Sequence, residues 1–76
     1  MSIDEKLTIV RKALEMGAYV EVKFHGLESE EEALNITADL KELVKEPFEK
    51  EAVNGSCWFQ SNDFENKVEA VVYFKA

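Results

Sequence analysis

Hydrophobic residues recur at helical spacing in two segments of the chain. Residues 3–16 carry one such stripe, formed by Ile3, Leu7, Val10 and Leu14, with Ala13 widening it. Residues 30–45 carry a second stripe, formed by Ala33, Ile36, Thr37, Leu40, Leu43 and Val44. Because steps of three and four residues return to the same helix face, each segment is predicted to be an amphipathic helix with one buried side.

The ends of both helices are marked by residues that favour helix boundaries. Each segment opens on a serine with a glutamate three residues later, Ser2 with Glu5 and Ser29 with Glu32. In a capping box the serine accepts from the glutamate's N–H, and the glutamate reaches back to the serine's N–H. Gly17 is placed to end the first helix in the left-handed conformation, and Pro47 stops the second near Glu46.

Between and after the helices, the hydrophobic period changes to two, which is typical of strands. Residues 18–25 alternate, with Ala18, Val20, Val22 and Phe24 on the core side, and residues 26–28 are predicted to form a turn. In the final strand the even positions from Val68 to Phe74 belong in the core. Residues 61–66 read as a polar loop before that strand.

Asn54-Gly55 is the strongest turn signal in the chain, because both positions of a type I′ turn need positive φ. A two-residue hairpin there pairs Ala52 with Cys57 and Lys50 with Phe59. This register places Lys50 on the core face, which is tolerable at a sheet edge where the ammonium group reaches water.

These elements predict an α+β fold in the order α-β-α-β-β-β, formed by residues 1–76 as a single domain. We expect two helices packed on one face of a four-stranded antiparallel or mixed sheet. If the first two strands run parallel, the helix between them forms a crossover connection.

The net charge of −7 is unevenly distributed. Residues 1–27 are balanced, with four acids and four bases, whereas residues 28–76 carry twelve acids and five bases. Such a surface repels nucleic-acid backbones and anionic membranes, so neither is expected as a partner, and it attracts basic protein patches. A solubilising role explains the same charge. One cysteine and no apolar segment of membrane-spanning length predict a cytoplasmic protein.

The sequence offers no catalytic, cofactor or metal motif. His25 and Cys57 are the only residues of their types, and the alternation places them on opposite sheet faces. One histidine and one cysteine cannot form a structural zinc site, and the acidic run at residues 28–32 lacks the spacing of a calcium loop. The glycines do not form a phosphate-binding loop. We therefore expect a protein that is not an enzyme and binds no cofactor.

The candidate partner-binding residues are those predicted to point away from the helices: Tyr19, Trp58, Val71 and Tyr73. Exposed aromatics are enriched at interfaces, so this face is predicted to bind a protein partner or a second copy in a homodimer. Cross-strand aromatic pairing that stabilises the sheet without any partner explains the pattern equally well. The surrounding glutamates make single-stranded RNA a poor ligand.

Three stretches of the first third of the chain resemble small uncharacterised proteins of Gram-positive bacteria and their phages. They are Glu5–Leu14, Gly17 and Val22–Gly26. The resemblance implies a bacterial or phage cytoplasmic setting and no known activity. The expected function is a small acidic protein-interaction module, such as a phage or mobile-element regulator that binds a host protein. The alternative is an acidic mimic of nucleic acid that blocks a basic groove.

Overall fold

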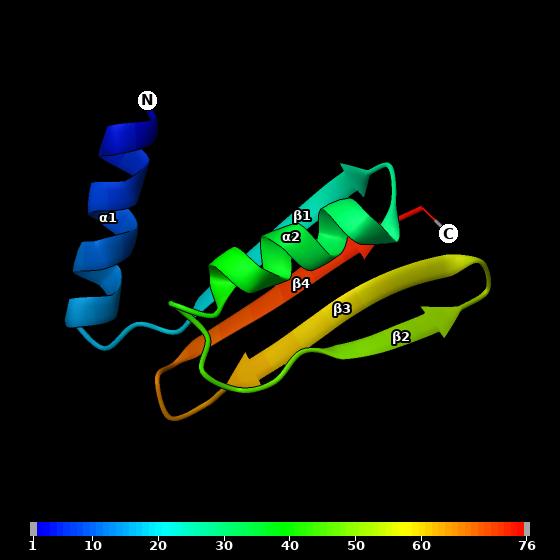
Figure 1. Ribbon diagram of the computed structural model, residues 1–76. Coiled ribbons are helices and arrows are strands. Elements are labelled where there is room, and N and C mark those ends of the chain that lie inside the picture. Colours follow the sequence, from blue (N-terminus) through cyan, green and yellow to red (C-terminus); the bar gives the residue numbers. More distant parts are fainter. Residues whose placement is uncertain (1, 76) are drawn as a thin grey trace.

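The computed structural model describes residues 2–75, which form two helices and four strands. In chain order these are α1 (Ile3–Glu15), β1 (Val20–Leu27), α2 (Glu30–Leu40), β2 (Glu49–Val53), β3 (Ser56–Asp63) and β4 (Val68–Phe74) (Figure 1). The predicted α+β class and element order are confirmed. The strands form one mixed sheet in the order β1-β4-β3-β2.

The last strand of the chain is a central strand of the sheet. β4 pairs in parallel with β1 and antiparallel with β3, and β3 pairs antiparallel with β2. The β2–β3 turn is at Asn54-Gly55, where φ is 50° and 83°, and the predicted pairs Ala52–Cys57 and Lys50–Phe59 are confirmed. β1 and β2 therefore run parallel at opposite edges, and α2 connects them across the sheet.

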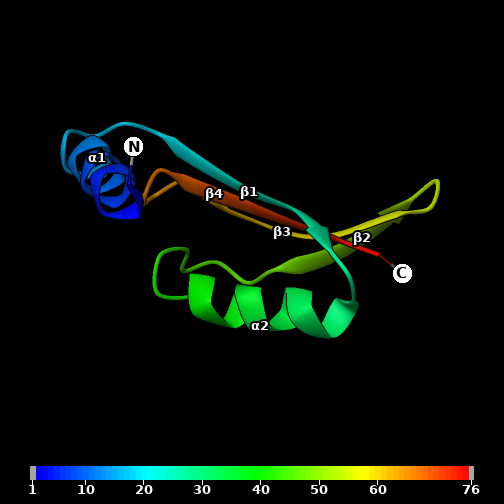
Figure 2. The ribbon, with the colours of Figure 1, turned by 90° about the horizontal axis from the view of Figure 1, so that it is seen from above.

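The second helix covers one face of the sheet, and Figure 2 shows α2 lying along it. Its Ala33 is fully buried against Phe59, Val72 and Phe74, which come from β3 and β4. A second cluster joins Val44, just after α2, to Val68 and Ala70. The core therefore lies between α2 and the two central strands, as the even positions of the final strand predicted. Lys50 at the edge forms an ion pair with Glu30 of α2.

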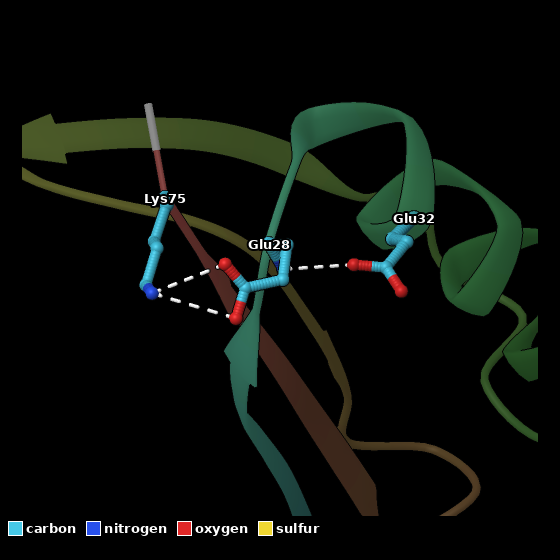
Figure 3. Close-up of polar contacts among 3 residues, drawn as sticks. All are labelled: Glu28, Glu32 and Lys75. Atoms are coloured by element: carbon cyan, nitrogen blue, oxygen red, sulfur yellow. Dashed lines mark hydrogen bonds and ion pairs between the residues drawn. The ribbon is translucent and has the colours of Figure 1, made fainter.

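The start of α2 is fastened to the end of β4. Ser29 Oγ accepts a hydrogen bond from Glu32 N at 3.2 Å, as the capping box predicted. The Glu32 carboxylate, however, accepts from Glu28 N at 2.8 Å rather than from the serine's own N–H. Glu28 also pairs with Lys75 Nζ at 3.1 Å (Figure 3). The cap therefore reaches one residue further back than expected, to the backbone N–H of Glu28.

The first helix contacts the sheet much less than the second. Gly17, with φ of 86°, ends α1 as predicted, but α1 meets only β1 and buries none of its residues. Figure 1 shows it standing beside the end of the sheet. Ile3 is 75% exposed and Leu7 58% exposed. The predicted stripe is thus partly shielded only towards its C-terminal end, where a short connection joins β1.

The first strand is shifted relative to its predicted bounds. It begins at Val20 and continues through Gly26 and Leu27, which were expected to form a turn. The pairing with β4 moves out of step between Phe24 and Leu27, which indicates a bulge, and Gly26 has a φ of 77°. Pairing with the parallel neighbour β4 extends the strand past a residue that would otherwise favour a turn.

The predicted polar loop at residues 61–66 is wrong in its first half, because the turn between β3 and β4 occupies residues 64–67. β3 continues to Asp63, and both Ser61 and Asp63 are buried. Ser61 Oγ donates to Glu46 O at 2.8 Å, and the Asp63 carboxylate accepts from Lys45 N at 2.9 Å. These polar side chains form hydrogen bonds with backbone groups of the segment that follows α2. That segment is not helical, because α2 ends at Leu40 instead of continuing to Lys45 as predicted. At Ser61 and Asp63 polarity therefore indicates buried hydrogen bonding, whereas residues 64–66 form a turn as predicted.

The carboxylate of Asp63 makes stability depend on pH. Asn66 donates to it from Nδ2 at 2.8 Å and from its backbone N at 3.1 Å. These bonds, with that from Lys45, hold the pKa of Asp63 below its ordinary value of 3.8. Because the pKa is lower in the folded state, the stabilisation is present above pH 3.8 and is lost as pH falls through the folded-state value.

We therefore expect Asp63→Asn to lower the unfolding temperature at pH 7 by roughly 5–10 °C, since in either orientation its NH2 group would face a backbone N–H, that of Lys45 or that of Asn66. Its stability should also fall less steeply than that of the wild type below pH 4. Asp39→Asn, at an exposed position of α2, is the matched control. Thermal unfolding of the three proteins between pH 2.5 and 7 measures both effects. Equal acid slopes in wild type and Asp63→Asn would contradict this role.

Candidate functional site

The face of the sheet opposite α2, called here the outer face, brings together three of the four predicted partner-binding residues. Trp58 of β3 and Tyr73 of β4 are directly paired, with ring centroids 5.8 Å apart. Val71 lies two residues before Tyr73 on the same side of β4. Tyr19, just before β1, is 47% exposed and connects to this face through its hydroxyl, which donates to the Glu69 carboxylate at 3.4 Å.

His25 joins this group, although sequence reasoning did not include it among the site residues. Its ring stacks on Tyr73 with centroids 4.7 Å apart and planes within 11° of parallel. His25, Tyr73 and Trp58 therefore form an aromatic row across three adjacent strands. The alternation of β1 placed His25 on the outer face. The missing information was the strand order, because only the pairing of β1 with β4 brings His25 beside Tyr73.

The aromatic row is held in place by its neighbours. Trp58 Nε1 donates to Gln60 Oε1 at 2.9 Å, and Glu51 of β2 is paired with Trp58 from the other side. Val71 is only 6% exposed, although it alternates with the β4 residues that pack under α2. Its strand partners are Lys23 and Gln60, two longer side chains of the same face. The outer face thus presents two half-buried rings, Trp58 and Tyr73, and one exposed ring, His25, each in contact with a neighbouring side chain.

Acidic side chains share the outer face with the aromatic row. On the outer face the four strands carry four glutamates, Glu21, Glu49, Glu51 and Glu69, and one lysine, Lys23. Lys23 Nζ pairs with Glu21 at 3.1 Å. Glu21 and Glu69 are direct partners across β1 and β4, an arrangement of like charges that is unfavourable. The pKa of Tyr19 is raised above its ordinary value of 10.0. The largest cause is partial burial, followed by the negative charge of Glu69 and then that of Glu21.

His25 and Cys57 lie on opposite faces, as predicted. Cys57 is paired with Phe74 on the α2 side, at the rim of a hollow of about 330 Å³. The two lysines of that hollow are engaged with glutamates, Lys50 with Glu30 and Lys75 with Glu28. Among residues 2–75, no group of three potential metal-ligating side chains is found. No helix in this part of the chain has the length and apolar character needed to cross a membrane.

Comparisons with known proteins yield no relative for this chain. No family model, curated protein or solved structure matches it. A functional proposal therefore has to be argued from the geometry and charge of the outer face.

Because Trp58 is only half-buried, its replacement should cost less stability than the replacement of a core residue. We expect Trp58→Ala to destabilise the fold by about 1 kcal/mol, because it removes a cross-strand contact from a half-buried position. Phe59→Ala, on the neighbouring core position that is 7% exposed, should cost about 3–5 kcal/mol. Urea unfolding of both variants gives the comparison. Equal losses would show that Trp58 is a core residue and unsuited to partner binding.

Proposed function

We propose that this protein is a small acidic interaction module that binds a protein partner through the outer face. In the setting suggested by its resemblance, it acts in the bacterial cytoplasm as a phage or mobile-element regulator of a host protein. The aromatic row of His25, Tyr73 and Trp58 is the observation that carries the proposal. Its rings are ordered by their own sheet and remain accessible to a partner.

Ordered aromatic rings favour binding for a physical reason. A side chain that is free in the unbound protein loses conformational entropy when a partner immobilises it, and that loss weakens association. The hydrogen bond from Trp58 to Gln60 and the stacking of His25 on Tyr73 restrict these rings beforehand. Large aromatic side chains also dominate the energy of many protein interfaces. The outer face therefore has the features of a preformed binding surface.

An acidic mimic of nucleic acid is the second candidate, favoured by the charge distribution. The twelve acids and five bases of residues 28–76 make this part of the chain strongly negative. Three glutamates, Glu30, Glu31 and Glu32, lie in the first turn of α2, on the other side of the sheet from the aromatic row. A mimic would bind a basic groove through such carboxylates, so its affinity would fall steeply with salt.

Affinity capture from a bacterial host lysate distinguishes the two candidates when three forms of the protein are compared. We expect wild type to retain a partner at low salt and to keep part of it at high salt, whereas Trp58→Ala loses most of it at both. Leu7→Ala is the matched control, because Leu7 is an exposed apolar residue of α1 away from the outer face. Loss of the partner with Leu7→Ala but not with Trp58→Ala would instead assign binding to α1.

The salt dependence tests the second candidate in the same experiment. Capture that disappears at 0.5 M salt and is unaffected by Trp58→Ala would favour the nucleic-acid mimic and contradict the outer-face proposal.

The proposal also includes the absence of catalysis. We expect a His25→Phe, Cys57→Ala double variant to keep its biological activity, because phenylalanine preserves the stack on Tyr73 while both reactive groups are removed. Circular dichroism would establish that the variant is folded. A folded double variant that still captures the partner but has lost biological activity would indicate a chemical role.

A further inference from the structure

The outer face combines aromatic rings with unbalanced negative charge. We propose that its occupant is a basic segment of the partner protein, with arginine side chains that stack on the aromatic row and pair with glutamates of the same face. This inference rests on the proposed function and adds the chemistry of the partner. Its first support is charge complementarity, since four glutamates face one lysine on this surface.

The positions of the charges relative to the rings favour arginine. Glu51 is paired with Trp58 at one end of the aromatic row. Glu69 and its neighbour Glu21 lie four residues before Tyr73 and His25 on their strands, which corresponds to roughly 13 Å along the sheet. A guanidinium group stacks on an aromatic face and also binds a carboxylate through two hydrogen bonds. The outer face thus offers both the aromatic rings and the carboxylates with which a guanidinium group interacts.

The pairing of two of these glutamates, Glu21 with Glu69, adds to this support. Their carboxylates carry like charges on directly opposed residues, and Lys23 bonds to Glu21. The Glu69 carboxylate accepts a hydrogen bond from the Tyr19 hydroxyl, which is neutral and does not compensate its charge. A cation brought by a partner would compensate the remaining negative charge between these strands. The fold therefore contains an unfavourable charge arrangement that a basic ligand relieves.

The same charges argue against the other occupants of this face. A second copy of the chain would bring its own four glutamates against these four, so a symmetric dimer through the outer face is electrostatically disfavoured. Single-stranded nucleic acid would stack on the rings, but its phosphates would meet the same glutamates. A basic polypeptide satisfies both the rings and the carboxylates.

The test uses a defined probe, an end-capped peptide of four Arg-Ser repeats, because alternate residues of an extended chain point to one side. Nuclear magnetic resonance titration of the full chain should shift the signals of Trp58, Tyr73 and His25 most strongly. The corresponding Lys-Ser peptide should bind more weakly, since lysine lacks the planar group that stacks on the rings. Equal affinities of the two peptides would overturn the assignment to arginine.

Two charge-matched variants separate the outer face from general attraction to an acidic protein. Glu21→Gln/Glu69→Gln removes two negative charges from the outer face, and Glu31→Gln/Glu42→Gln removes two exposed charges from α2 and the turn after it. We expect the first variant to weaken peptide binding roughly fivefold and the second less than twofold. Equal weakening, or shifts centred on α1 or α2, would overturn the proposal.

The remaining outcomes distinguish this inference from the proposed function. Concentration-dependent shifts of the outer face without peptide would assign it to a second copy and overturn the basic partner. A peptide that does not contact the outer face, together with partner capture that depends on Trp58, would overturn the inference and leave the proposed function standing. Partner capture that does not depend on Trp58 would contradict both this inference and the proposed function.

Discussion

The burial of β4 between its two neighbours and beneath α2 is the interaction on which the rest of the structure depends. Val68, Ala70 and Val72 of this strand are almost completely buried, and they connect both hydrophobic clusters. One helix of eleven residues covers only one face of a four-stranded sheet. The other face must therefore stabilise itself through contacts between its own side chains. The aromatic row and the shielding of Val71 are the result.

This division of the sheet links stability to the proposed binding surface. The residues that shield the outer face are also the residues that a partner would contact, because nothing from α2 lies between them and solvent (Figure 2). Cross-strand aromatic pairing and partner binding, which the sequence left as alternatives, are therefore compatible. The Trp58–Tyr73 pair orders the surface, and an ordered surface binds at a lower entropic cost. Under the proposed function, the glutamates of this face favour basic partners.

Local patterns predicted most of the secondary structure but not its spatial order. Gly17 and Asn54-Gly55 were recognised because their turns require positive φ, and both have it. Ser61 and Asp63 were misassigned to a loop because their role depends on backbone groups after α2, fifteen or more residues away. His25 was missed for a related reason, since its contact with Tyr73 requires the non-local pairing of β1 with β4. The predicted outer-face residues followed from period-two alternation alone.

Cross-saturation transfer from a bound partner to the isotope-labelled chain tests the central claim most directly. In the complex with the captured partner, magnetisation passes only to residues in direct contact with that protein. The account predicts the strongest transfer at Trp58, Tyr73 and His25, with little at α1. Strong transfer to exposed residues of α1, such as Leu7, and none to Trp58 or Tyr73 would contradict it.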